Sequence, residues 1–129
     1  MFQTIEWTSA GTVRLIDQRK LPIEEVYVEC RDLADVAHAI RTMQIRGAPA
    51  IGVAGAMGLA LGAKTIRTDG FAAFFEELSR KGEELLRTRP TAVNLAWGIA
   101  RMKRCAEKNR DIPVPAIVQA LIQEAQAIR

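Results

Sequence analysis

The stretch from Ala48 to Ala63, APAIGVAGAMGLALGA, limits what the chain can fold into more than any other. Every residue in it is apolar, glycine or proline, so it has no polar face to turn toward water. It is also shorter than the roughly 18–20 apolar residues that a helix needs to span a bilayer. The sequence therefore predicts a buried helix in the middle of a soluble domain, and no membrane partner.

Four glycines are spread along this predicted helix, at Gly52, Gly55, Gly58 and Gly62, with alanines between them. Each glycine lowers helix stability by about 1 kcal/mol relative to alanine. A helix with so little side-chain bulk lets neighbouring elements come close to its backbone. We expect tight packing at the centre of the domain, above all around Gly58 and Gly62, and a supporting role for the helix itself.

Composition narrows the class of protein. A chain of 129 residues with 49% hydrophobic and 26% charged residues is typical of one globular domain, here residues 1–129. The net charge of +3 and the aromatic content of 5% do not suggest nucleic-acid binding. Cys30 and Cys105 fit no metal or redox spacing, and His38 is the single histidine, so we predict no metal site. Isolated thiols and the lack of a signal sequence favour the cytoplasm. His38 lies off the apolar stripe of its segment, so we expect it at the surface.

The first part of the chain reads as extended. Apolar and polar residues alternate in the segments 4–7, 12–17 and 26–30. The four residues 8–11 suit a hairpin loop, and residues 18–25 a longer return. The pattern predicts a small antiparallel sheet over residues 4–30.

From Asp32 onward the apolar spacing becomes helical, with Asp32 as the expected N-cap and Asp35 at the third helical position. Further helices are expected to begin at Pro49 (running to about Ile66), after Asp69–Gly70, at Pro90 and at Pro115. The fourth helix is expected to continue through the apolar positions Val93, Trp97 and Ala100. The predicted fold is α+β: the small sheet, then a bundle of about five helices over residues 32–129.

The last predicted helix is still in phase at Arg129, without a residue that would end it. Either a further domain follows, or the helix ends there naturally. The pattern alone leaves both possibilities open.

An anion site is predicted where Arg46, Gly47 and Ala48 precede the glycine-rich helix. The first N–H groups of a helix are unpaired and carry the positive end of its dipole. Gly47 allows a ligand to approach closely or the backbone to take an unusual φ, and Pro49 fixes the helix entry. The planar guanidinium of Arg46 suits phosphate oxygens. Together these features favour a corner that binds a phosphate.

Arg89 also stands immediately before a proline, and Thr88, Thr91 and Asn94 add polar side chains near it. Two such arginines could converge on one phosphate or sugar phosphate. The alternative is that both are simply solvated, as arginines before helices often are.

Asp17 lies at the end of a predicted strand, where it could cap a loop or point into a cleft. The sequence contains no Ser/His/Asp set and no glycine-rich nucleotide motif. We therefore assign no catalytic residue to this chain.

The chain resembles the N-terminal region of the methylthioribose-1-phosphate isomerase family in four segments: IEW, VRLIDQRKLP, AIRTMQIRGAPAIGVAGAMGLAL and RPTAVNLAWGI. That family is related to regulatory subunits of the translation-initiation exchange factor. The resemblance runs from about residue 4 to the C-terminus. It implies an aldose–ketose isomerase of methionine salvage, homodimeric and without a metal or organic cofactor. It also implies that Arg46, Gly47, Ala48 and Arg89 bind the substrate.

Members of the family continue into a larger Rossmann-like domain that supplies a catalytic cysteine and aspartate. Cys30 and Cys105 do not match that cysteine motif, so the resemblance implies an N-terminal substrate-binding domain, inactive alone, whose partner is the C-terminal catalytic domain. Two alternatives remain at this point. The substrate could be another sugar phosphate, such as ribose 1,5-bisphosphate, or the domain could be a non-enzymatic interaction module like the translation-factor relatives.

Overall fold

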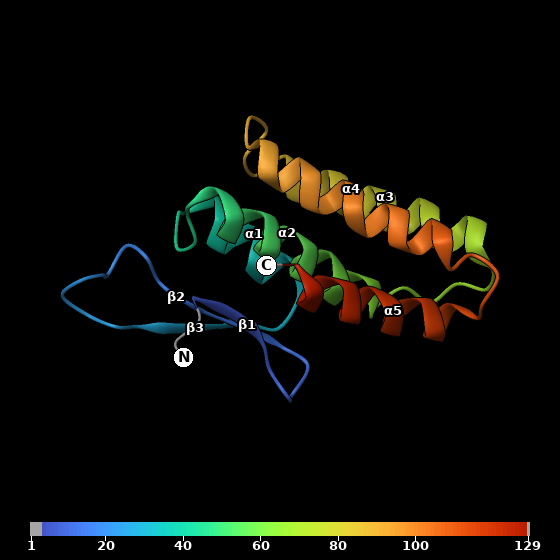
Figure 1. Ribbon diagram of the computed structural model, residues 1–129, viewed down its shortest axis with the longest axis horizontal. Coiled ribbons are helices and arrows are strands. Elements are labelled where there is room, and N and C mark those ends of the chain that lie inside the picture. Colours follow the sequence, from blue (N-terminus) through green and yellow to red (C-terminus); the bar gives the residue numbers. More distant parts are fainter. Residues whose placement is uncertain (1–3, 129) are drawn as a thin grey trace.

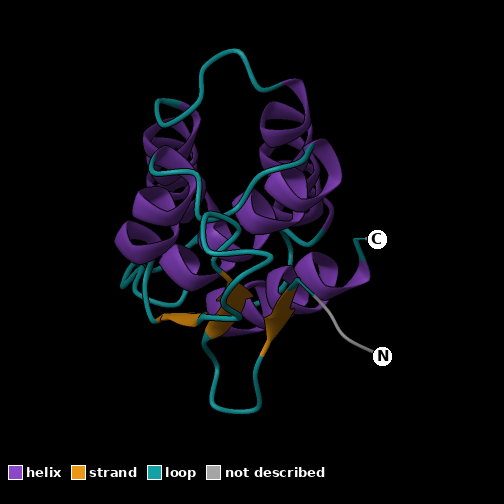
Figure 2. Ribbon diagram, turned by 90° about the vertical axis from the view of Figure 1, so that its left-hand side faces the viewer, coloured by secondary structure: helices purple, strands orange, loops and turns teal. Residues whose placement is uncertain are grey.

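The computed structural model describes residues 4–128 and confirms the predicted α+β architecture, a three-stranded antiparallel sheet followed by five helices (Figure 1). The sheet order is β1-β2-β3, and the sheet lies beside one end of the helical bundle (Figure 2). The elements are β1 Ile5–Trp7, β2 Val13–Ile16, β3 Tyr27–Cys30, α1 Leu33–Arg41, α2 Ala48–Ala63, α3 Phe71–Leu86, α4 Val93–Lys108 and α5 Val114–Ala127.

The sheet follows the predicted alternation. Leu15 of β2 pairs with Ile5 on one side and Val28 on the other, and it is fully buried. The predicted hairpin loop closes where the N–H of Thr8 donates to the carbonyl of Thr12 over 2.8 Å. Gly11 has a φ of 80° in this loop, a conformation that glycine adopts without steric cost.

Helix α1 begins as its sequence predicts. The carboxylate of Asp32 accepts a hydrogen bond of 2.8 Å from the N–H of Asp35, which satisfies a donor that the helix cannot pair internally. Val36 and Ile40, on the predicted apolar side, are fully buried. His38 is exposed, as expected.

Helix α2 is the central element of the bundle. It packs against β1 and all four other helices, which explains why it needs no polar face. A Cβ placed on Gly58 would lie 2.9 Å from a methyl of Val36, and one on Gly62 would lie 2.8 Å from a methyl of Leu33. The prediction of tight packing at these two glycines is confirmed.

Helices α2 and α4 approach each other closely at their glycines. A Cβ placed on Gly98 would lie 2.5 Å from the carbonyl oxygen of Gly52. One turn further along α2, Gly55 faces the side chain of Leu95 at similarly short range. Small residues on both helices therefore let the two backbones meet.

The predicted start of the fourth helix is wrong. Helix α4 begins at Val93, and Pro90 lies in the preceding turn, where the N–H of Ala92 donates to the carbonyl of Arg89 over 3.0 Å. Proline fits the second position of such a turn because its φ is already set. The apolar positions Val93 and Trp97 also face outward, with 78% and 46% of their surfaces exposed.

The bounds of two other helices differ slightly from the predicted ones. α2 and α5 each begin one residue before their predicted proline, and α2 ends at Ala63 rather than Ile66. Helix α5 ends at Ala127, and Ile128 is extended and buried. Both cysteines are free and buried, as the lack of a motif suggested. No helix within residues 4–128 is long and apolar enough to cross a membrane.

Candidate functional site

Three of the four predicted site residues meet at one cavity. Gly47, Ala48 and Arg89 line a space of about 280 Å³ between the start of α2 and the start of α4. Arg46 is exposed and is not among the residues that line it. The apolar part of the lining consists of Ile51, Ala92 and Val93, which sequence reasoning did not assign to a site. Asn94, a polar residue that the sequence places near Arg89, also lines the cavity.

The start of α2 presents open backbone donors at this cavity. Gly47 has a φ of 98° and a ψ of 133°, which only glycine adopts without strain, and no side chain caps the helix. The first hydrogen bond of the helix runs from the N–H of Ile51 to the carbonyl of Gly47 over 3.0 Å. The N–H of Ala48 comes before this bond and has no partner inside the helix. Such a helix start favours an anion.

Arg89 lies in the connection between α3 and α4 rather than directly before a helix. Beside it, the hydroxyl of Thr88 donates to the carbonyl of Leu85 over 2.6 Å, so this hydroxyl is used within the protein. The Nη1 atom of Arg89 is buried, yet it has no hydrogen-bond partner within residues 4–128. A buried donor without an acceptor is costly. A phosphate oxygen would supply the acceptor that this guanidinium lacks.

The structure decides the role of Asp17 that the sequence left open. Its side chain is only 3% exposed and accepts hydrogen bonds from Nε and Nη2 of Arg19 over 3.0 and 2.8 Å. It also accepts from the backbone N–H of Arg19. The hydrogen-bonded Arg19 guanidinium lowers the pKa of Asp17 below its usual value, although burial opposes this. Asp17 therefore caps its own loop.

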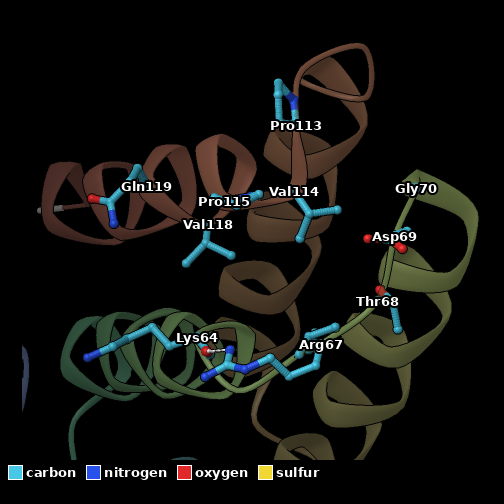
Figure 3. Close-up of a pocket in the computed structure, with 11 residues that line it drawn as sticks. Lys64, Arg67, Thr68, Asp69, Gly70, Pro113, Val114, Pro115, Val118 and Gln119 are labelled. Carbon is cyan, nitrogen blue, oxygen red and sulfur yellow. Dashed lines mark hydrogen bonds between the residues drawn. The ribbon is translucent and has the colours of Figure 1, made fainter.

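A larger cavity lies elsewhere, between the α2–α3 connection and the start of α5 (Figure 3). It has a volume of about 770 Å³, but none of the predicted site residues lines it. Its two cations already donate to the protein: Arg67 to the carbonyl of Lys64 over 2.8 Å, and Lys64 to that of Gly11 over 3.0 Å. Thr68, which also lines this larger cavity, has a buried hydroxyl without a hydrogen-bond partner within residues 4–128, but that group is neutral. We therefore place the candidate site at the smaller cavity, where a charged donor lacks an acceptor.

Metal chemistry has no obvious location in the described chain. Within residues 4–128, no group of three or more histidine, cysteine, aspartate or glutamate side chains is arranged to hold a metal ion. Burial raises the pKa of the Cys30 thiol to about 12, so this thiol stays protonated at neutral pH. Neither observation assigns a catalytic group to this chain.

Comparison with known proteins places this geometry in context. The family model described as "Initiation factor 2 subunit family" matches residues 44–129. A methylthioribose-1-phosphate isomerase from Geobacter sulfurreducens is 54% identical over 96% of this chain, and one from Pelotomaculum thermopropionicum is 44% identical over 99%. The chain spans 36% of the length of the first relative and 35% of the second.

Solved structures show the same fold in proteins with two different names. The 5-methylthioribose 1-phosphate isomerase from Pyrococcus horikoshii matches with a TM-score of 0.89 and 38% identity. The delta subunit of translation initiation factor eIF-2B from A. fulgidus matches with a TM-score of 0.87 and 36% identity. Each match covers 99% of this chain and 36% of the solved one.

Proposed function

Because the chain belongs to the initiation factor 2 subunit family, we propose that it is the substrate-binding part of a sugar-phosphate isomerase in that family. The substrate is 5-methylthioribose 1-phosphate, and the product is 5-methylthioribulose 1-phosphate, a reaction of methionine salvage in the cytoplasm. Support for this substrate comes from the names of relatives that are 44–55% identical to the chain. The rest of the polypeptide supplies the catalytic cysteine and aspartate, and the whole protein is a homodimer.

One structural observation carries the binding role. The uncapped start of α2 lines the same cavity as Arg89, whose Nη1 has no hydrogen-bond partner within residues 4–128, although the two are far apart in the sequence. A phosphate group would accept hydrogen bonds from both. Arg46 is exposed and directly precedes Gly47 in the sequence, so it adds a second positive charge near the helix start.

Phosphate binding contributes to the reaction through orientation. A phosphate on C1 prevents the sugar ring from opening to a free aldehyde, so an acid must open the ring before a proton or hydride moves between C2 and C1. Holding the phosphate dianion fixes C1 and C2 relative to the catalytic groups and compensates the negative charge. Arg89, Gly47 and Ala48 perform this holding, and the proton chemistry belongs to the remainder of the protein.

The likeness to the eIF-2B delta subunit supports one alternative, a non-enzymatic interaction module. In that case Arg46 and Arg89 would serve the fold or contact a protein partner. The alternative predicts a stable complex with a partner and no affinity for phosphate esters. The identity to the isomerases in sequence favours the enzyme.

Calorimetry on the full-length protein tests the binding role. Arg89→Ala removes a charge-assisted hydrogen bond, each of which is worth about 1.5–3 kcal/mol, so affinity for 5-methylthioribose 1-phosphate should fall roughly 10- to 100-fold. Arg89→Lys should recover part of it. Arg87→Ala is the matched control, because Arg87 is exposed and does not line this cavity. Unchanged affinity in the Arg89→Ala variant would remove this arginine from the site.

A further inference from the structure

The exposed indole of Trp97 is not explained by the phosphate site. Trp97 lies on the outward face of α4 and is 46% exposed. It borders a second cavity of about 340 Å³, whose other lining residues are Pro49, Gly52, Asn94 and Ile128. Within residues 4–128, no charged residue lines this second cavity. Apart from the amide of Asn94 and the indole N–H of Trp97, the described side chains that line it are apolar.

The second cavity adjoins the phosphate site. Asn94 lines both cavities. The second cavity is also lined by Pro49 and Gly52, which directly follow Ala48 and Ile51 of the phosphate site in the sequence. The two spaces thus lie side by side along the starts of α2 and α4. We call the two neighbouring cavities together the cleft: the guanidinium-bearing Arg89 lines the first, and the indole of Trp97 lines the second.

A cation on the same helix lies beside the indole ring. The guanidinium carbon of Arg101 lies 5.5 Å from the centre of the Trp97 ring, within the range of a cation–π contact. Arg101 is itself anchored, because its Nε donates to the carboxylate of Glu124 on α5 over 2.6 Å. These two contacts favour the observed orientation of the ring, and a subsite that is ordered before binding costs less free energy to occupy.

We propose that Trp97 is a specificity-determining residue whose ring forms the subsite for the 5-methylthio group of the substrate. The inference rests on the proposed function, since it extends the same cleft. The phosphate on C1 and the thioether on C5 lie at opposite ends of the ribose, which matches a cleft that is charged at one end and apolar at the other. A thioether sulfur also makes favourable contacts with aromatic rings. A 5-hydroxyl in this place would gain nothing from the ring.

The test compares two substrates on the full-length enzyme: 5-methylthioribose 1-phosphate and ribose 1-phosphate, which carries a hydroxyl on C5. In the Trp97→Ala variant, kcat/KM for the methylthio substrate should fall about 10- to 200-fold, which is the range for the loss of a small apolar contact in a pocket. Most of this fall should come from a higher KM. The value for ribose 1-phosphate and inhibition by inorganic phosphate should stay within about twofold. Trp97→Phe, which retains an aromatic ring, should recover most of the preference. Ile23→Ala is the control, because Ile23 is 92% exposed and lies in a loop outside both cavities.

The possible results separate this inference from the proposed function. If wild-type enzyme isomerises the methylthio substrate and Trp97→Ala keeps the wild-type preference, Trp97 is not the subsite and the phosphate site stands. Equal losses on both substrates, with a lower melting temperature, would show a structural role and also overturn the inference. If the wild-type protein neither binds nor isomerises either substrate, the proposed function fails, and this inference fails with it.

Discussion

Replacing Gly98 with alanine tests the helix contact on which the candidate site depends. The new Cβ would lie 2.5 Å from the carbonyl oxygen and 3.4 Å from the Cα of Gly52, against an ordinary contact range of 3.4–4 Å. Alanine raises helix propensity by about 1 kcal/mol. Overpacking costs about 1–3 kcal/mol, and the upper end applies here because a backbone carbonyl cannot rotate away. We expect the free energy of unfolding to fall by about 2 kcal/mol.

Urea denaturation and thermal melting of the purified protein would measure this loss, which corresponds to a fall in Tm of roughly 6–10 °C for a domain of this size. Gly82→Ala is the matched control: its Cβ would lie 2.9 Å from a side-chain methyl of Ile99, which can shift. In that variant the gain in helix propensity should offset most of the packing cost. If Gly98→Ala proves as stable as the wild type, α2 and α4 can separate freely and the contact does not hold the site together.

Two predictions concern pH and thiol chemistry. Because the pKa of Asp17 is lowered by folding, its stabilising contribution is present above the unfolded value of about 3.9 and is lost as the pH falls through the folded value. The urea midpoint of the wild type should therefore fall more steeply than that of Asp17→Asn between about pH 5 and about pH 3. Parallel curves for the two proteins would contradict the role of the ion pair with Arg19. Since folding raises the pKa of Cys30 to about 12, the thiol should resist alkylation at a pH of about 8 until urea unfolds the protein, and unfolding should become easier above the ordinary thiol pKa of about 8.5. Rapid alkylation of Cys30 in the native protein would show that the thiol is not buried as described.

The sequence was sufficient to predict the elements whose signals are local. The N-cap of α1 depends on Asp32 and on the N–H three residues later, so the pattern and the observed hydrogen bond agree. The central place of α2 followed from its lack of any polar residue, which leaves a helix no face for water. For the candidate site, the same local argument identified Gly47 and Ala48 at a helix start.

The fourth helix was predicted less well because its packing does not follow its bulkiest residues. Val93 and Trp97 are large apolar residues, but both are exposed in the structure. The face of α4 that packs against α2 carries Gly98, and Leu95 and Met102 are among the buried large residues of this helix. Two glycine backbones in contact leave no hydrophobic signal in either segment. Pro90 added to the error, since proline suits the second position of a turn as well as the first turn of a helix.

The same glycine contact accounts for the position of the candidate site. Ala48 and Arg89 belong to segments that the sequence shows only as separate helix starts, and nothing local brings them together. The contact between Gly52 and Gly98 sets the distance between α2 and α4, and a Cβ on Gly52 would also come within 2.9 Å of the carbonyl oxygen of Asn94. A larger residue at either glycine would push apart the two walls on which the cavities lie. Stability and binding should therefore decline together in Gly98→Ala. In Gly82→Ala the new Cβ meets a side-chain methyl of Ile99, which can shift, rather than the backbone of α2, so binding of the phosphate should stay unchanged.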